Sequence, residues 1–447
     1  MRIHLIAVGG AVMHNLALAL RANGHTVSGS DDEIYDPART RLAAAGLLPA
    51  AMGWHPERIT PAIDLILLGM HARADNPELQ RAQALGLRIE SFPSYVYAHA
   101  REKTRVAVCG SHGKTTTTAM LMHVLRACGR DFDYLVGAQL DGFERMVRLS
   151  DAPLMLIEGD EYLSSALDRN PKFLHYRSQL TVLTGIAWDH INVFPTEADY
   201  VRQFARLLHT LPPGGQLFFD RTDPLTRDLV RRAPDHLDVT GYTALPVEAD
   251  GTYRSEGGSA RLQVFGAHNY KNLAAARAVC LALGVTEAEF TAAIGSFTGA
   301  ARRLDVFHTD DTRTVWKDFA HAPSKVRATT AAVKAQSGDR PLTAALELHT
   351  FSSLNADFLP QYAGALDAAD HAFVYYSPHT LEMKRLPPLD PDTVCRAFGR
   401  ADLRVLTDAA ELEEVTQAAA TGNLLLMSSG RWNGYDWQAT LQRQTGR

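Results

Sequence analysis

The sequence predicts an α/β protein in which parallel sheets, flanked by helices, are divided among three segments of the chain. The chain has 447 residues, which is too long for one ordinary hydrophobic core. Short apolar runs alternate with helical patterns, and several of the runs end in glycine or in polar residues, as buried parallel strands do. Ligands of such sheets bind where the strands end. The runs are IHLIAVG, LILLGM, RVAVCG, LMLIEG, LTVLTGI, LTAALEL, HAFVYY and LLLMSSG.

The composition indicates a globular protein that binds neither nucleic acid nor a membrane. Hydrophobic residues make up 46% of the chain and charged residues 21%, so no region has the composition of a disordered segment. The formal net charge of −5 gives no overall basic field for nucleic acid or an anionic membrane. The apolar stretch LIAVGGAVM near the N-terminus is too short to span a membrane and lacks a signal-peptide cleavage site. We expect a buried strand and helix there.

The cysteines favour a cytoplasmic location. They lie far apart in the sequence, and none forms a C-x-x-C pair, so we expect neither a zinc site nor a disulfide framework. They are Cys109, Cys128, Cys280 and Cys395.

Two breaks divide the chain into domains at 1–103, 104–298 and 299–447. The first segment has a strand, a helix and a second strand, HTVSGSD, which together make half of a nucleotide-binding unit. A polar hinge over 101–104 ends this segment. The second break follows the predicted helix NYKNLAAARAVCLALG, because a new strand in TVWKDFAHAPS begins a third α/β unit.

The stretch VAVCGSHGKTTTTAM predicts a phosphate-binding loop between a strand and a helix. Gly110 and Gly113 can adopt backbone angles that let amide N–H groups converge on phosphate oxygens at a helix N-terminus. Lys114 would add a positive charge for the outer phosphates, and Thr115 could offer its hydroxyl to Mg²⁺. Val108 stands where the full P-loop pattern has glycine, so this loop is a shortened relative. The alternative is a glycine turn that caps an ordinary helix.

Two further strand ends carry polar groups that suit a metal ion. Glu158, Asp160 and Glu161 follow the strand LMLIE, and clustered carboxylates need a cation, hydrogen bonds or open solvent. Carboxylate oxygens suit Mg²⁺, the usual partner of a nucleotide in a phosphate loop. Asp189 and His190 end the next strand, where His190 could serve a second cation or play a structural role. A solvated acidic loop is the alternative for the carboxylates.

Other candidates leave alternatives open. The Gly9–Gly10 turn could bind a nucleotide or serve only as a tight turn. A nicotinamide-dependent dehydrogenase would need a third glycine where Met13 and His14 stand. The asparagines of GAHNYKN could read a purine edge or cap a helix, and the residues alone favour capping.

The motifs GSHGKTTT, EGDEY, WDH, GAHNYKN, ARRLD and DFAHAPS, in this order along the whole chain, resemble those of the Mur ligase family. These are ATP-dependent enzymes that form amide bonds in bacterial peptidoglycan. The resemblance implies a Rossmann-like domain for a UDP-sugar and a central P-loop domain for ATP. It also implies a Rossmann-like C-terminal domain that brings the amine substrate and closes over ATP.

The resemblance also assigns roles to residues. Lys114, Glu158 and His190 would be catalytic, with Thr115 and Glu158 on one Mg²⁺ and His190 on a second. ATP would contact Gly110, Ser111, His112, Gly113, Lys114, Thr115, Thr116, His268, Asn269, Asn272, Arg302, Arg303 and Asp318. The UDP-sugar would contact Gly9, Gly10, Met13, His14, Ser30, Asp31, His71 and Arg73, and the amine substrate would contact His321, His349 and Ser352.

Within the family, the run RNPKFLHY at 169–176 resembles members that join a preformed murein tripeptide to UDP-N-acetylmuramate. The alternatives are a ligase for L-alanine and a homologue that binds nucleotides without turnover. Two departures bear on the amine: Ala322 replaces a second histidine, and 346–355 lacks the arginine that relatives carry for an incoming carboxylate. We expect a monomer or a weak homodimer.

Overall fold

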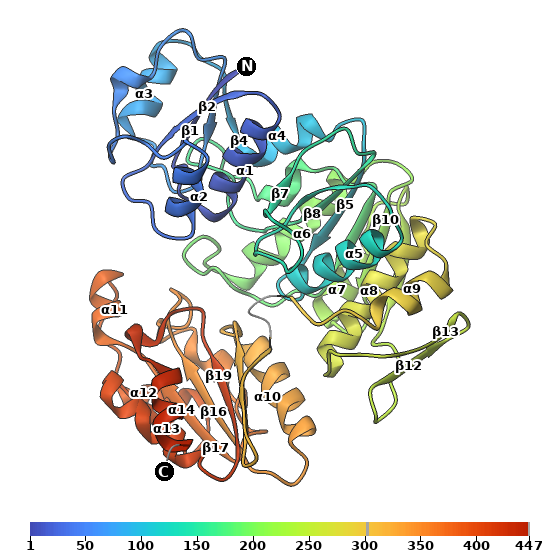
Figure 1. Ribbon diagram of the computed structural model, residues 1–447, viewed down its shortest axis with the longest axis vertical. Helices are drawn as coiled ribbons and strands as arrows, with labels where there is room; N and C mark the ends of the chain where they lie inside the picture. Colours follow the sequence, from blue (N-terminus) through green and yellow to red (C-terminus); the bar gives the residue numbers. More distant parts are fainter. Residues whose placement is uncertain (301–303, 446–447) are drawn as a thin grey trace.

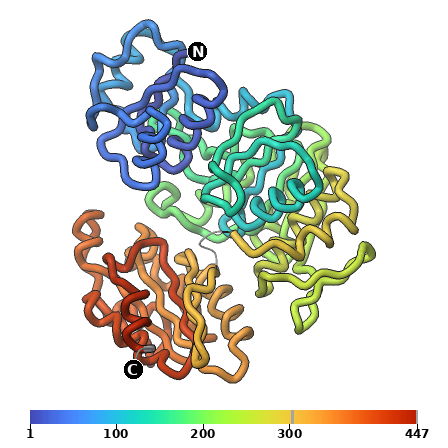
Figure 2. The backbone as a smooth tube through the Cα atoms, in the orientation of Figure 1, coloured from blue at the N-terminus to red at the C-terminus, as the bar shows by residue number. Residues whose placement is uncertain are grey.

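The computed structural model describes residues 1–300 and 304–445, and it contains three large sheets that follow one another along the chain. Figure 1 shows these sheets in three separate lobes, with the N-terminal and C-terminal lobes on the same side of the central one. The backbone tube in Figure 2 follows the chain through the lobes in sequence order. The predicted three-part α/β fold is therefore confirmed. Among the described residues, no helix is both long and apolar enough to cross a membrane.

The N-terminal sheet has four parallel strands in the order β2-β1-β3-β4. Its central strand β1 is almost entirely buried, which explains the apolar run at the start of the chain. Helix α1 begins directly after the Gly9–Gly10 turn, as expected. The elements are β1 (Arg2–Ile6), α1 (Ala11–Ala22), β2 (Thr26–Ser30), α2 (Ala38–Ala44), β3 (Leu65–Leu68), α3 (Pro77–Ala84), β4 (Ile89–Ser91) and α4 (Phe92–His99).

The central sheet has the strand order β11-β10-β9-β5-β8-β6-β7, and all of its pairs except β6–β7 are parallel. A hairpin of β12 and β13 projects from this lobe (Figure 1). The elements are β5 (Thr104–Cys109), α5 (Lys114–Ala127), β6 (Asp133–Leu135), β7 (Val147–Arg148), β8 (Leu154–Glu158), η2 (Lys172–His175), β9 (Leu180–Leu183), α6 (Glu197–Thr210), β10 (Gln216–Asp220), α7 (Pro224–Val230), β11 (Asp238–Tyr242), β12 (Thr252–Ser255), β13 (Gly258–Arg261), α8 (Ala267–Ala282) and α9 (Glu287–Ile294).

The order of the central strands places three sequence motifs side by side. Strand β5 lies between β8 and β9, and all three run in the same direction. Their carboxyl ends therefore meet at one edge of the sheet. The loop at Gly110, the acidic segment that begins at Glu158 and the segment with Asp189 and His190 all begin at that edge.

The C-terminal sheet has the order β14-β15-β19-β16-β17-β18, with β14 antiparallel to β15 and the other pairs parallel. The elements are β14 (Asp305–Thr309), β15 (Thr314–Asp318), α10 (Pro323–Ser337), β16 (Leu342–Glu347), β17 (His371–Tyr375), α11 (Pro378–Met383), α12 (Pro391–Phe398), β18 (Arg404–Leu406), α13 (Glu413–Ala418), β19 (Asn423–Met427) and α14 (Trp437–Thr445).

Every apolar run quoted from the sequence contains a strand, but the sheets are not purely parallel. The sequence did not predict three antiparallel features, which are strand β7, strand β14 and the β12–β13 hairpin. Strands β12 and β13 have few buried side chains, so they lack the apolar runs by which the other strands were recognised. The third sheet begins at β14, upstream of the strand expected to open it. The domain boundaries at 103 and 298 remain predictions.

Asp133 joins the N-terminal helix α4 to the central sheet. Its buried carboxylate accepts hydrogen bonds from Lys103 Nζ at 2.6 Å, from Ser150 N–H at 2.9 Å and from Ser150 Oγ at 2.6 Å. His99 Nε2 lies 3.0 Å from the same carboxylate. Burial raises the pKa of Asp133, but the hydrogen bonds from His99, Lys103 and Ser150 outweigh it, so the net pKa lies below the usual value. The carboxylate is therefore the stable form in the folded protein.

Asp133→Asn is expected to lower the free energy of unfolding by about 3 kcal/mol at pH 7, because it leaves a buried ion-pair network without its acceptor charge. A lowered folded pKa means that this stability is present above the unfolded carboxyl pKa and is lost as pH falls through the folded pKa. The difference from the unchanged protein should therefore hold at neutral pH and shrink below about pH 4. Urea unfolding at each pH measures it.

Asp131→Asn is the control, because Asp131 is 62% exposed and pairs with Arg148 across 2.7 Å. Such an exposed pair contributes about 0–1 kcal/mol. Equal stabilities of the two variants at pH 7 would show that Asp133 does not hold these segments together.

Candidate active site

The loop between β5 and α5 depends on glycine at two positions. Gly110 has φ of 123° and Gly113 has φ of 82°, both in the region that other residues rarely adopt. A Cβ at Gly110 would overlap the Thr184 hydroxyl, and one at Gly113 would overlap Asn272 Oδ1. Thr184, which follows β9, donates its hydroxyl to the carbonyl of His112 and thereby fixes the loop. Sequence reasoning did not identify Thr184.

No side chain caps the start of helix α5, where Gly113 is the N-cap residue. Gly113 thus ends the turn and begins the helix, and whether the loop also binds phosphate stays a prediction. The first N–H groups of a helix have no intrahelical partners and point along the helix axis, so the start of a helix attracts anions. This geometry fits the phosphate chain of a nucleotide.

Lys114 lies in a buried cluster of charges. Its Nζ is 2.6 Å from Glu161 Oε2 and donates to the Gly110 carbonyl at 2.6 Å. Glu161 Oε1 lies 3.3 Å from His190 Nε2 and accepts from the Tyr200 hydroxyl at 3.1 Å. Glu161, which is 2% exposed, therefore links the loop to the segment after β9. The motif placed Glu161 with Glu158 and Asp160 as a possible metal ligand, whereas in the structure its partners are Lys114, His190 and Tyr200.

The electrostatics of this cluster favour the charged forms of Lys114, Glu161 and His190. Burial lowers the pKa of Lys114, but the carboxylates of Glu161 and Asp160 outweigh burial and raise it above the usual value. Burial raises the pKa of Glu161, but Lys114 and His190 bring it far below the usual range. For His190, burial lowers the pKa, while Glu161 and Asp189 raise it to a net value above the ordinary one.

Thr115 and Glu158 lie together, as a shared metal site requires. The Thr115 hydroxyl donates to Glu158 Oε1 at 2.8 Å, and Gly137 N–H donates to Glu158 Oε2 at 2.8 Å. Within residues 1–300 and 304–445, no three His, Cys, Asp or Glu side chains are grouped as a protein-only metal site would need. One carboxylate and one hydroxyl fit Mg²⁺ instead, because this ion keeps waters and binds through substrate phosphates. Glu158 and Glu161 are only 9% and 2% exposed, so these two carboxylates do not lie in open solvent, whereas the side chain of Asp160 is 42% exposed.

These groups line a cavity of about 180 Å³, which we call the acidic cavity. His321 and Lys325 of the C-terminal domain complete its wall. The residues that line it are Ser111, Gly113, Lys114, Thr115, Thr116, Glu158, Asp160, Glu161, Asp189, His190, His321 and Lys325.

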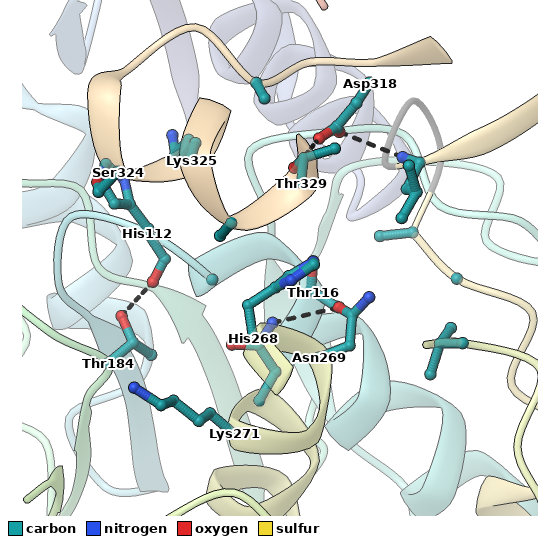
Figure 3. A pocket seen from close by; sticks show the side chains of 18 residues that line it. His112, Thr116, Thr184, His268, Asn269, Lys271, Asp318, Ser324, Lys325 and Thr329 are labelled. Atoms are coloured by element: carbon teal, nitrogen blue, oxygen red, sulfur yellow. Dashed lines mark hydrogen bonds between the residues drawn. The ribbon is translucent and has the colours of Figure 1, made fainter. Parts of the chain in front are cut away.

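A second cavity, the helix cavity, lies between the starts of α8 and α10 and has a volume of about 200 Å³ (Figure 3). Both ring nitrogens of His112 are buried there without a hydrogen-bond partner among the described residues. Asp318 accepts hydrogen bonds from the Thr329 hydroxyl at 2.7 Å and from Leu304 N–H at 3.2 Å. Unpartnered buried nitrogens suit a polar ligand, since such groups are costly when left unsatisfied.

The asparagines of α8 do not cap their helix, which corrects the expectation drawn from the residues alone. Gly266 is the N-cap residue and no side-chain cap is present. Asn269 donates to the Phe265 carbonyl at 2.8 Å, and Asn272 lies against Gly113. His268, Asn269 and Asn272 all line the helix cavity. Arg302 and Arg303, expected at the same nucleotide, lie outside the described residues.

A third cavity, the N-terminal cavity, lies between the N-terminal and central domains and has a volume of about 320 Å³. Of the residues predicted for a UDP-sugar, Gly10, Met13 and His71 line it. Its lining residues are Ala7, Gly10, Ala11, Val12, Met13, Met70, His71, Phe92, Lys114, Leu135, Gly137, Glu158, Asp160, Lys172 and Tyr176.

Other predicted UDP-sugar residues have partners within the protein. Asp31 Oδ2 accepts from Gly9 N–H at 2.7 Å, and burial raises the pKa of Asp31 to about 6. Ser30 is buried and donates its hydroxyl to Glu78. His14 Nδ1 lies 2.9 Å from the Gly10 carbonyl, one turn earlier in α1.

Arg73 extends into solvent. Its side chain is 86% exposed, and its Nε lies 3.4 Å from the Asp75 carboxylate. The structure therefore does not place Arg73, Ser30 or His14 on the wall of the N-terminal cavity.

The residues predicted for the amine substrate lie in different surroundings. His321 lines the acidic cavity, and His349 Nδ1 lies 3.8 Å from Glu347 Oε1. Ser352 is 4% exposed and donates its hydroxyl to Asp189 Oδ1 at 3.1 Å, across the interface between the central and C-terminal domains. The rings of Trp188 and Phe358 pack edge to face at the same interface, with centroids 5.6 Å apart. The described conformation therefore brings the two domains together over the acidic cavity.

Comparison with known proteins gives matches along the chain. A model described as the Mur ligase family catalytic domain matches residues 2–104, and one for the Mur ligase middle domain matches residues 108–280. A UDP-N-acetylmuramate–L-alanyl-γ-D-glutamyl-meso-2,6-diaminoheptandioate ligase of Haemophilus influenzae is 28% identical, and the match covers 97% of each chain. A UDP-N-acetylmuramate–L-alanine ligase of Rubrobacter xylanophilus is 30% identical over 95% of this chain and 88% of that one.

Among solved structures, a murein peptide ligase of Psychrobacter arcticus has the same fold over the full length. Its TM-score is 0.70 and its identity 25%, and the match covers 100% of this chain and 99% of that one. The chain therefore belongs to the Mur ligase family, and it is a ligase that forms a C–N bond.

Proposed function

We propose that this protein joins the lactyl carboxylate of UDP-N-acetylmuramate to the amine of the murein tripeptide L-alanyl-γ-D-glutamyl-meso-diaminopimelate, using ATP. The observation that carries the proposal is that the acidic and N-terminal cavities share Lys114, Glu158 and Asp160. A carboxylate in one cavity can thus meet a phosphate chain in the other. The peptide ligase of Haemophilus influenzae, which matches over 97% of each chain, supports the choice of amine.

Activation of the carboxylate is the first step. A carboxylate oxygen attacks the γ-phosphorus of ATP, the bond from that phosphorus to the β,γ-bridging oxygen breaks, and ADP leaves. The products of this step are ADP and an acyl phosphate. The protein supplies position and positive charge and needs no nucleophile of its own. Lys114 and the uncapped start of α5 lie where they can bind the phosphates.

Amide formation is the second step. The amine nitrogen attacks the acyl carbon, the bond from carbon to the phosphate oxygen breaks, and inorganic phosphate leaves as the nitrogen loses a proton. The C-terminal domain would bring the amine, since His321 reaches the acidic cavity and Ser352 bonds to Asp189. His349 would contact the substrate peptide farther from its reacting nitrogen.

Thr115 and Glu158 would hold one Mg²⁺ and His190 would face a second, and these ions when bound would neutralise phosphate charge. The helix cavity, with His112, His268 and Asn269, would take the nucleoside part of ATP. We further propose a cytoplasmic enzyme that is a monomer or weak homodimer and binds no nucleic acid.

An L-alanine ligase is the second candidate, because the relative from Rubrobacter xylanophilus is 30% identical. Its amine substrate carries one carboxylate near the reacting nitrogen, whereas the tripeptide carries carboxylates farther away. The choice between them depends on the C-terminal domain.

Phosphate release with each amine separates the two candidates. With ATP, Mg²⁺ and UDP-N-acetylmuramate, the tripeptide should give kcat/KM at least about 100-fold higher than L-alanine, a difference of about 2.7 kcal/mol in transition-state binding. A coupled phosphate assay with mass spectrometry of the amide product measures it. A preference for L-alanine would reverse the assignment of the amine, and no product with either would refute the proposed activity.

Lys114→Ala should reduce kcat at least about 1,000-fold, because the variant loses a preorganised charge at the transferring phosphoryl group. Circular dichroism and thermal unfolding check that the variant folds. Lys334→Ala, which removes a lysine that is 33% exposed and paired with Asp370 away from the cavities, should keep full activity. Turnover by Lys114→Ala near the normal rate would exclude this loop as the site of phosphoryl transfer.

Gly113→Ala should raise the KM for ATP at least about tenfold, because a left-handed residue with a Cβ is strained and this Cβ would overlap Asn272. Gly129→Ala is the matched control: Gly129 has φ of 67°, and a Cβ there meets nothing within 4 Å. Initial rates over a range of ATP concentrations measure both variants. An equal rise in KM in both would mean that the contact at Asn272 is unimportant.

A further inference from the structure

Lys172 is a buried cation to which the motifs assigned no role. It is only 5% exposed and begins the short helix η2, after the acidic segment. Its ammonium lies 3.6 Å from Met70 Sδ of the N-terminal domain. It also lies over the rings of Phe92 and Tyr162, 5.8 Å and 5.6 Å from their centroids. A lysine ammonium group in such apolar surroundings is unusual, because charged groups are rarely buried unless they are paired.

The partner of Lys172 within the protein is Asp160, whose Oδ2 lies 2.5 Å from the ammonium nitrogen. Lys172 is the buried member of the pair, whereas the side chain of Asp160 is 42% exposed, and a buried charge is costly unless it is paired. The pair lines the N-terminal cavity, so it faces a space that a ligand can enter. An ammonium has three N–H donors; Asp160 accepts one and Met70 Sδ accepts another weakly, which leaves one donor for an anion.

The position of Lys172 in this cavity distinguishes it from the other anion-binding groups. Asp160, its partner, also lines the acidic cavity, so Lys172 lies beside the junction of the two cavities. Lys114 is at the same junction, but its ammonium is directed to Glu161 and the Gly110 carbonyl. At another part of the N-terminal cavity, Gly10 precedes the uncapped start of α1, where the pyrophosphate of a nucleotide would fit.

Neighbouring His71 is not a competing cation. Burial lowers the pKa of His71, and the positive charge of Lys172 lowers it further. His71 is therefore mainly neutral at pH 7, and Lys172 carries the positive charge in this part of the cavity.

We propose that Lys172 binds the lactyl carboxylate of the sugar nucleotide at the junction of the N-terminal and acidic cavities. This inference rests on the proposed function and adds a substrate-binding residue to it. A carboxylate must approach the polyphosphate chain before it can attack, and like charges repel. A fixed ammonium in a poorly solvated place offsets that repulsion. Asp160 is a positioning residue, since it holds the ammonium in place.

Binding of two sugar nucleotides tests the assignment. UDP-N-acetylmuramate carries the lactyl carboxylate, whereas UDP-N-acetylglucosamine has the same nucleotide and lacks it. Isothermal titration calorimetry on the full chain measures both affinities. Lys172→Met should raise the Kd for UDP-N-acetylmuramate roughly 10- to 100-fold, which is the usual effect of losing a hydrogen bond to a charged group. It should leave the affinity for UDP-N-acetylglucosamine within about twofold, and that affinity also shows that the variant is folded.

Three further variants sharpen the test. Lys172→Arg keeps the charge and should retain most of the preference for UDP-N-acetylmuramate. Lys334→Met removes another lysine paired with an aspartate at 2.5 Å, far along α10, and should change neither affinity. The double variant Lys172→Met with Asp160→Asn also removes the carboxylate charge that the single variant leaves without its cation, so it should fold even if the single variant does not. Its binding of UDP-N-acetylmuramate should stay weak.

Each contrary result has a distinct meaning. An equal fall in both affinities would overturn the proposal, because Lys172 would then serve the pyrophosphate or the structure. Recovery of UDP-N-acetylmuramate binding in the double variant would also overturn it, since the loss in the single variant would then come from repulsion by the unpaired charge of Asp160. Failure of the unchanged protein to bind either sugar nucleotide would instead refute the proposed function itself.

Discussion

The carboxylates of Asp160 and Glu161, which follow β8, can lie side by side because cations lie among them. Asp160 pairs with Lys172 across 2.5 Å, and Glu161 contacts Lys114 at 2.6 Å and His190 at 3.3 Å. Without these partners the carboxylates would repel one another in a poorly solvated space. The adjacency of β9, β5 and β8 supplies the partners, because it brings the ends of these strands to one edge of the sheet. Sheet order thus determines the charge pattern of the site.

The same charge pattern explains why the site involves more than one domain. The central domain provides the phosphate loop, the carboxylates and Lys172. The N-terminal domain forms the other wall of the N-terminal cavity, and the C-terminal domain adds His321 and Lys325 to the acidic cavity. The bond from Ser352 to Asp189 ties the last of these to the segment that carries His190. A phosphoryl-transfer site gains from exclusion of water, since electrostatic interactions are stronger in a dry cavity. Separate domains that meet at the site can exclude water and still admit three substrates.

Local motifs predicted some parts of the site better than others. The loop at Gly110 and the acidic segment were recognisable because glycine angles and clustered charges leave a signal within a few residues. Asn269 and Asn272 were misread as helix caps, because their partners, the Phe265 carbonyl and the loop at Gly113, are visible only after folding. Ser30 and Arg73 follow strand ends as binding residues do, yet one is bonded to Glu78 and the other is in solvent. A strand end alone does not show which way a side chain points.

By itself the sequence determined the α/β class and the strands in its apolar runs. It also determined the turn at Gly110 and Gly113, whose backbone angles favour glycine. Each of these features depends on residues that are neighbours in the sequence. Tertiary structure decided which polar groups share a cavity. Lys172 and Met70 are far apart in the sequence, as are Lys114 and Glu161, and their contacts arise from strand order and domain packing. The electrostatic energy of a buried charge depends on such distant neighbours. The charge of the site is therefore a property of the folded chain.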